Sequence, residues 1–261
     1  MSSRVITSLI GLPILIAIIY VGGHLLTAAV LLLTLTALHE LFKGFRSIEI
    51  HAMEKLTLVA VLAIYGGYVM VLDQIFYLFV VSVFVIMLML INLFGKALHI
   101  YDISATALGF LYVVLPFFHI VLVAEFNSLF FISLVFLLAW VSDTCAYFAG
   151  RFFGKHKLLP AVSPKKTVEG AIGGVAGTVI LVTIFSAVLE PGFIWFAVPL
   201  GLFGSVSGQI GDLIASKIKR IMGIKDFGKL FPGHGGVLDR FDSIMMTAPI
   251  VFYVAYVYKL F

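Results

Sequence analysis

The sequence predicts an all-α, polytopic integral membrane protein with about nine transmembrane helices. Of its 261 residues, 62% are hydrophobic and only 11% are charged, whereas about 25% of the residues in a soluble domain are charged. The mean hydropathy is +1.18. The apolar residues fall in runs of about 20, the length that a helix needs to cross a hydrocarbon core about 30 Å thick.

Nine such runs follow one another along the chain. The first comes after Arg4 and resembles a signal peptide, but no small-residue cleavage site follows it, so we interpret it as an uncleaved helix. The second contains His39 and Glu40, and the third contains the sequence Tyr65-Gly66-Gly67, which makes these two spans the least regular. The predicted spans are 5–22, 25–42, 56–72, 76–95, 104–124, 129–149, 170–189, 193–215 and 241–258.

The basic residues predict the orientation, because nearly all of them lie in alternate loops. Sixteen of the 17 lysines and arginines fall on one side of the predicted membrane, and only Lys259 falls on the other. Cytoplasmic loops are enriched in lysine and arginine. We therefore expect a cytoplasmic N-terminus and an external C-terminus. The sixteen are Arg4, Lys43, Arg46, Lys55, Lys96, Arg151, Lys155, Lys157, Lys165, Lys166, Lys217, Lys219, Arg220, Lys225, Lys229 and Arg240.

We expect one membrane domain with two parts. Residues 1–125 hold spans one to five, and residues 126–261 form a catalytic half with spans six to nine and their cytoplasmic loops. The net charge of +4 does not indicate a nucleic-acid partner, because topology already accounts for the basic residues. The single cysteine, Cys145, excludes an intrachain disulfide and a multi-cysteine zinc site, and we expect it to serve packing.

Two segments on the predicted cytoplasmic side hold nearly all the unusual residues. Segment 216–242 reads SKIKRIMGIKDFGKLFPGHGGVLDRFD and combines four carboxylate or imidazole groups with six basic residues and five glycines. Segment 142–170 contains Asp143 and the sequence SPKKTVEG at 163–170. Neither composition is needed to cross a membrane. Since both lie on the same side, they are expected to form one site that holds a polyanion and a metal ion.

Span eight carries a polar stripe beside a glycine stripe. Ser205, Gln209, Asp212 and Ser216 follow helical spacing and share one face. A carboxylate in a membrane span is costly and usually lines a cavity or forms an ion pair, so we expect Asp212 to be functional, and Asp143 on span six by the same argument. The neighbouring Gly201, Gly204, Gly208 and Gly211 are typical of close helix packing.

Asp239 and Asp242 are three residues apart at the start of span nine, so on a helix both carboxylates could reach one cation. Magnesium is commonly held by one or two carboxylates together with substrate phosphate. Helix capping accounts for only one of the two acids.

The glycines of 232–236 suit a turn whose backbone amides approach a phosphate. Lys165–Lys166 and Lys219–Arg220 would alone be ordinary basic anchors of a membrane protein. Ser163 and Thr167 beside a helix start make the first pair a plausible triphosphate cradle.

These residues bear a resemblance to a known family, the integral-membrane CTP:phosphatidate cytidylyltransferases, or CDP-diacylglycerol synthases. The family signature is fulfilled without a gap from Ser216 to Asp242, and its second hallmark stands at 163–170. The family pattern around Asp143, Thr144, Tyr147, Gly150 and Arg151 is also present. The motif-bearing resemblance covers roughly residues 140–245.

The resemblance implies transfer of CMP from CTP to phosphatidic acid, with CDP-diacylglycerol and pyrophosphate as products. It also implies Mg²⁺, a second, monovalent cation such as K⁺, a homodimer, and a multi-pass protein of the inner (plasma) membrane whose active site faces the cytoplasm. The implied metal ligands are Asp212 and Asp239, and the further catalytic residues are Asp242, Asp143, Lys166 and Arg240. The implied substrate-binding residues are Ser163, Lys165, Lys166, Thr167, Ser216, Lys219, Arg220, Lys225, Asp226, His234, Gly235 and Gly236.

Three alternatives stay open on the residues alone. An enzyme could use CTP on an isoprenoid lipid, as a cytidylyltransferase or as a polyprenol kinase. A transporter could use Asp143 and Asp212 as an ion pathway, although the polar residues cluster at one membrane face. A non-catalytic scaffold for anionic lipid would not need Asp226, Asp239 and Asp242 among its basic residues.

Overall fold

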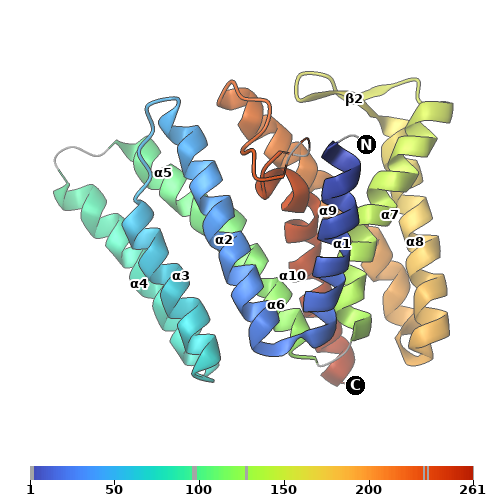
Figure 1. The fold of residues 1–261 in the computed structure, drawn as a ribbon, viewed down its shortest axis with the longest axis horizontal. Helices are drawn as coiled ribbons and strands as arrows, with labels where there is room; N and C mark the ends of the chain where they lie inside the picture. Colours follow the sequence, from blue (N-terminus) through green and yellow to red (C-terminus); the bar gives the residue numbers. More distant parts are fainter. Residues whose placement is uncertain (1–2, 96–98, 127–128, 232, 234, 261) are drawn as a thin grey trace.

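The computed structural model of the chain describes residues 3–95, 99–126, 129–231, 233 and 235–260. In this part of the chain nine helical rods pack side by side (Figure 1), and each coincides with one predicted span. The rods are α1 (Ser3–Val21), α2 (Gly23–Arg46), α3 (Glu54–Val69), α4 (Gln74–Phe94), α5–η1–α6 (Ile100–Gly109, Phe110–Val114, Leu115–Ala124), α7 (Leu129–Phe153), α8 (Val168–Leu189), η2–α9 (Pro191–Phe193, Ile194–Ile221) and α10 (Leu238–Leu260).

The predicted all-α membrane fold is confirmed. Seven of the described helices are long and apolar enough to cross a bilayer. Helix α3 has 16 residues, and the described apolar part of α1 is Gly11–Val21, so both are shorter than the roughly 20 residues of a full span. Helix α1 corresponds to the first predicted span. Helix α3 corresponds to the third, which is one of the two spans with the least regular sequence.

Successive rods run in opposite directions, as Figure 1 shows. The connection from α7 to α8 and the connection from α9 to α10 therefore emerge at the same end of the bundle, where α1 begins and α2 ends. Helix α10 finishes at the opposite end (Figure 1). The two segments singled out by sequence are thus brought to one end, which we call the motif end.

The α7–α8 connection contains a small hairpin that the sequence analysis did not predict. Strand β1 (Lys157–Leu159) pairs antiparallel with β2 (Ser163–Thr167). The hairpin is closed by a hydrogen bond of 3.0 Å from the Val162 amide to the Leu159 carbonyl. At its end the Thr167 hydroxyl accepts a hydrogen bond from the Gly170 amide at 3.1 Å, which caps α8 as expected of a threonine before a helix. The lysines of SPKKTVEG therefore lie on a strand held against a helix start.

The glycine stripe of α9 packs as the sequence predicted. All four glycines are buried, and a side chain at any of them would meet a neighbouring helix at or inside van der Waals contact. Helix α9 can therefore lie directly against α7, α8 and α10, and it brings Asp212 to their shared end. The contacts pair Gly201 with Val179, Gly204 with Leu138, Gly208 with Thr247 and Gly211 with Met246.

We predict that Gly201→Ala destabilises the protein. The added Cβ would lie 2.8 Å from the Cα of Val179, and backbone cannot move aside as a flexible side chain can, so a cost of about 1–3 kcal/mol is expected. Gly66→Ala is the matched control, because nothing lies within 4 Å of that position and alanine favours a helix over glycine. Thermal unfolding in detergent should show a lower Tm for Gly201→Ala alone. Equal Tm values would contradict the packing argument.

Candidate active site

Asp239 is a buried carboxylate of the motif end that is held by three contacts. Its side chain is 2% exposed and lies 2.8 Å from the Lys219 ammonium through Oδ1. Its Oδ2 accepts hydrogen bonds from the Phe227 amide at 2.8 Å and the Gly236 amide at 2.9 Å. The Lys219 ammonium also lies 5.4 Å from the centre of the Phe227 ring. One carboxylate therefore ties together the end of α9, the loop that follows it, and the start of α10.

Glu40 on α2 is a second buried carboxylate at this end, and the sequence analysis gave it no role. It is 5% exposed. Its Oε1 accepts from the Val237 amide at 3.1 Å and its Oε2 from the Leu238 amide at 3.0 Å. These are among the first amides of α10, which no helical carbonyl can satisfy. A carboxylate there also complements the positive end of the helix dipole. The available signal was the high cost of an acid inside a membrane span.

The Gly-rich turn fits around these two carboxylates. A side chain at Gly228 or Gly236 would collide with Glu40, and one at Gly235 would lie 2.7 Å from Asp239 Oδ2. Gly235 also has a φ of 89°, which L-residues rarely adopt. The amides of residues 236–238 are bound to Asp239 and Glu40. Of the turn at 232–236 that the sequence analysis expected to face a phosphate, Gly236 thus has its amide bound within the protein.

Asp212 joins the hairpin to α9. Its carboxylate forms an ion pair with Lys166 of β2, and each side chain is partly exposed, 29% and 28% respectively. The Arg220 Nε donates to the Val162 carbonyl at 3.4 Å, which adds a second contact between the same two elements. The two motif segments predicted to form one site are thus in direct contact through these residues.

The polar face predicted on α9 forms a network with neighbouring helices. The hydroxyls of Ser205 and Ser142 lie 2.8 Å apart. Gln209 Nε2 donates to Ser142 Oγ at 3.2 Å and to the Ala171 carbonyl at 3.2 Å. These bonds fix α9 against α7 and α8 in the two helical turns that precede Asp212.

Asp143 and Asp242 complete a group of acidic residues. Both interact electrostatically with Asp212, and Asp143 also with Lys166 and Arg240. Asp242 is buried and accepts a hydrogen bond of 2.7 Å from the Ser243 amide. Asp143 is exposed, and its carboxylate forms no hydrogen bond or ion pair with another described residue. Four aspartates from α7, α9 and α10 therefore share one electrostatic environment with Lys166, Lys219 and Arg240.

The remaining predicted residues are less engaged. Ser163 and Ser216 are half-buried, whereas Lys165, Arg220, Lys225, Asp226 and Arg240 are exposed at the motif end. His234 lies outside the described residues. These exposed groups are available to a charged ligand.

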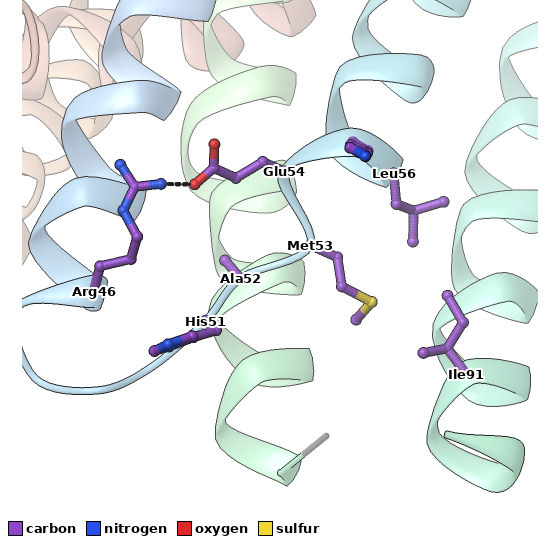
Figure 2. A pocket seen from close by; sticks show the side chains of 8 residues that line it. Arg46, His51, Ala52, Met53, Glu54, Leu56 and Ile91 are labelled. Atoms are coloured by element: carbon purple, nitrogen blue, oxygen red, sulfur yellow. Dashed lines mark hydrogen bonds and ion pairs between the residues drawn. The ribbon is translucent and has the colours of Figure 1, made fainter. Parts of the chain in front are cut away.

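A separate cavity of about 570 Å³ lies at the start of α3 (Figure 2). Within the described residues, its lining includes none of the predicted catalytic residues. An ion pair between Arg46 and Glu54 lies beside it. The other lining residues are His51, Ala52, Met53, Lys55, Leu56 and Ile91.

Comparison with protein families matches residues 2–258 to the cytidylyltransferase family. The chain belongs to this family. It is 32% identical over 263 aligned positions to a phosphatidate cytidylyltransferase of Staphylococcus haemolyticus, covering 96% of this chain and 97% of the relative. The corresponding Staphylococcus epidermidis protein is 33% identical with the same coverage. A Staphylococcus aureus phosphatidate cytidylyltransferase is 43% identical over 126 residues, 48% of each chain. The protein is accordingly a nucleotidyltransferase.

We predict that Glu40→Gln destabilises the motif end. A glutamine offers only one acceptor oxygen, so one buried amide at the start of α10 loses its partner, at a cost of about 1–3 kcal/mol. Glu49→Gln removes the same charge from an exposed position and should stay within about 0.5 kcal/mol of the parent. Hydrogen exchange of peptides covering 227–238 should accelerate only in Glu40→Gln. Unchanged exchange there would refute the anchoring role.

Proposed function

We propose that the protein is a phosphatidate cytidylyltransferase that converts CTP and phosphatidic acid to CDP-diacylglycerol and pyrophosphate. A phosphate oxygen of phosphatidate attacks the α-phosphorus of CTP, and the bond from that phosphorus to the bridging oxygen of the β-phosphate breaks. The observation that carries the proposal is the pairing of acidic and basic side chains from both motif segments at one end of a membrane bundle. Relatives with this name match over nearly the whole chain.

The location of the site suits one soluble and one lipid substrate. Acyl chains remain in the bilayer while the phosphate of phosphatidate lies at its surface, where a CTP molecule can meet it. Exposed aromatic side chains at the end of α7, such as Phe148, Phe152 and Phe153, would lie at the boundary between water and lipid, a common place for aromatic residues. The motif end is therefore placed to hold both phosphates.

Charge neutralisation is the main chemical task, because both substrates are anions. The transfer of a phosphoryl-type group depends on positioning and electrostatic stabilisation more than on covalent chemistry. We assign phosphate binding to Lys166, Lys219, Arg220, Lys225 and Arg240, and nucleotide contacts to Ser163, Lys165, Thr167, Ser216, Asp226, His234, Gly235 and Gly236.

The attacking oxygen does not require a general base. The second ionisation of a phosphomonoester has a pKa of about 6, so most of the phosphatidate phosphate is already a dianion at neutral pH. Asp143 and Asp242 are therefore better suited to bind or orient cations at the site than to remove a proton. We propose that role for both.

The site fits Mg²⁺. This ion is usually held by one or two carboxylates plus substrate phosphates, and among the described residues no group of three or more His, Cys, Asp or Glu side chains is arranged to hold a metal by itself. Asp212 and Asp239 are each paired with a lysine ammonium, so each already binds a cation. We propose Asp212 and Asp239 Oδ1 as the metal ligands, since two amides occupy Asp239 Oδ2. Bound Mg²⁺ would neutralise phosphate charge near the reacting phosphorus.

Lys166 and Lys219 then have two roles in the proposal. Without substrate they neutralise Asp212 and Asp239. With a metal ion on the two carboxylates, the Lys166 and Lys219 ammonium groups would be free to bind phosphate oxygens of the substrates. Flexible lysine side chains can change partners in this way without movement of the backbone.

The remaining features of the proposal concern setting and assembly. We propose a multi-pass protein of the bacterial inner membrane with the motif end in the cytoplasm, supported by the distribution of basic residues. A homodimer and a second, monovalent cation such as K⁺ are further parts of the proposal. So is the division into an N-terminal part, 1–125, and a catalytic half, 126–261.

The reaction is tested with purified protein, phosphatidate, Mg²⁺ and labelled CTP. Label from the α-position should enter the lipid, whereas label from the γ-position should leave as pyrophosphate. Entry of γ-label into lipid would instead identify a kinase, and absence of label in lipid from either position would refute the proposal. Replacing phosphatidate by an isoprenoid phosphate or a polyprenol tests the choice of lipid.

We predict that Asp212→Asn lowers kcat/KM by at least about 100-fold, the scale of losing one electrostatic contact at a reacting centre. Asp212 is a sharper test than Asp239, because Asp239 also anchors the loop. The control is Asp73→Asn, which changes the same charge at a helix N-cap where asparagine substitutes well. The rate should be measured across a range of Mg²⁺ concentrations. Turnover of Asp212→Asn close to that of the parent would remove Asp212 from the metal site.

We predict that residue 165 is reached by reagents only from the cytoplasm. Lys165→Cys and Lys259→Cys, each in a Cys145→Ala background, place single thiols at exposed positions. The first lies on β2 and the second near the end of α10, at opposite ends of the bundle (Figure 1). A membrane-impermeant maleimide should label Lys165→Cys only in inside-out vesicles and Lys259→Cys in intact cells. The reverse pattern would overturn the orientation and the access of cytosolic CTP.

A further inference from the structure

Tyr112 lies in an irregular segment of the fifth rod, between α5 and α6. Residues Phe110–Val114 form a short π-helix, and the Leu115 amide bonds to the Phe110 carbonyl five residues back. Single π-turns inside an α-helix are rare and often occur at functional sites. The sequence analysis gave this segment no role beyond crossing the membrane.

The Tyr112 hydroxyl is buried without a partner. The residue is 4% exposed, and the hydroxyl oxygen has no hydrogen-bond partner among the described residues. Each buried polar group of this kind needs an explanation. The hydroxyls of Thr183, Ser186 and Ser243 are also unpartnered, but short side chains can bond to a carbonyl of their own helix after a small rotation. A tyrosine hydroxyl stands at the far end of its ring and needs a partner from elsewhere.

Another buried tyrosine shows what a structural role looks like in this protein. Tyr65 is 2% exposed, and its hydroxyl lies 2.8 Å from the hydroxyl of Thr34, which in turn donates to the Val30 carbonyl at 2.8 Å. The Tyr65 hydroxyl therefore has its partner in the folded protein. The Tyr112 hydroxyl is buried to a similar degree and has none.

The Tyr112 hydroxyl lies within electrostatic range of the acidic group of the motif end. Phe110 stacks on Phe84 of α4 at 4.2 Å between ring centres, and a residue two positions further along a helix does not share that face. The Tyr112 hydroxyl interacts electrostatically with Asp242 most strongly, then with Asp212 and Asp239. The same rod packs against α10 about one turn further on, where the ring centres of Phe117 and Phe241 lie 5.7 Å apart. An unpartnered donor is thus buried on a rod that packs against α10, within electrostatic range of the carboxylates.

We propose that the Tyr112 hydroxyl donates a hydrogen bond to a phosphate oxygen of the substrate held at the aspartate site. This inference rests on the proposed function. A phenol with an ordinary pKa of about 10 is protonated at neutral pH and is therefore a donor to an anion. Phosphate oxygens supply the acceptor that the folded protein lacks, and the cations between them and the aspartates keep the two sets of negative charge apart.

The test compares Tyr112→Phe with Tyr65→Phe, two variants that each remove one buried hydroxyl. Three quantities are measured on purified protein in detergent: the Tm without ligand, the rise in Tm on adding Mg²⁺ with an α,β-methylene analogue of CTP, and the kcat and KM for CTP and for phosphatidate. Tyr112→Phe should keep or raise the ligand-free Tm, since an unsatisfied polar group is removed, and should lower kcat/KM by about 10–100-fold, as for a hydrogen bond to a charged group. Tyr65→Phe should lower the Tm and leave kcat/KM of the folded protein near that of the parent.

The kinetic constants distinguish the two sources of phosphate. A higher KM for CTP with a smaller rise in Tm on adding the analogue assigns the contact to the nucleotide, whereas a higher KM for phosphatidate with an unchanged analogue effect assigns it to the lipid. A lower kcat alone assigns it to an oxygen of the transition state.

Kinetic constants of Tyr112→Phe within about twofold of those of the parent would overturn the inference. So would a decrease in Tm as large as that of Tyr65→Phe, if activity is lost only because the protein unfolds. If the parent protein itself transfers no label to lipid, the proposed function fails instead. The analogue-induced rise in Tm then decides the role of Tyr112, and equal rises in parent and variant would refute it.

Discussion

Two buried carboxylates that bind backbone amides hold the motif end together. Asp239 accepts two amides and a lysine ammonium, and Glu40 accepts two amides at the start of α10. Buried charge is tolerated only when hydrogen bonds and opposite charge replace its hydration. These bonds fix the described residues on either side of the Gly-rich turn, namely Phe227 before it and Gly236, Val237 and Leu238 at its end.

The same bonds join the two parts of the chain. Glu40 comes from α2, whereas its amide partners begin α10, 197 and 198 residues later. The fifth rod carries the buried Tyr112 hydroxyl, which we propose as a further contact of the site. The N-terminal helices therefore do more than anchor the protein in a bilayer, because they supply groups that shape the site carried by the C-terminal helices.

Helix positions, glycine packing and the gathering of two motif segments at one end were all predictable from the sequence. These predictions rest on local or periodic signals: apolar runs of fixed length, small residues at helical spacing, and basic residues in alternate loops. Such signals can be recognised without knowledge of tertiary contacts. The hairpin at 157–167 was missed because its strands are three and five residues long and carry little periodicity. The ion pairs Lys166–Asp212 and Lys219–Asp239 could not be assigned from the sequence. Each loop contains several lysines, and position in the sequence does not show which of them reaches a given aspartate.

By itself, the sequence determined the membrane fold and the family, and it predicted the aspartates and lysines of the site, because hydrophobic length and a long ungapped motif are written in residue order. Only the tertiary structure decided which carboxylates are already engaged, which amides of the Gly-rich turn are taken, and that Glu40 binds the start of α10. Those facts depend on the approach of helices far apart in the chain. A buried charge or hydroxyl shows its role only through the partner that it meets, or lacks, across that distance.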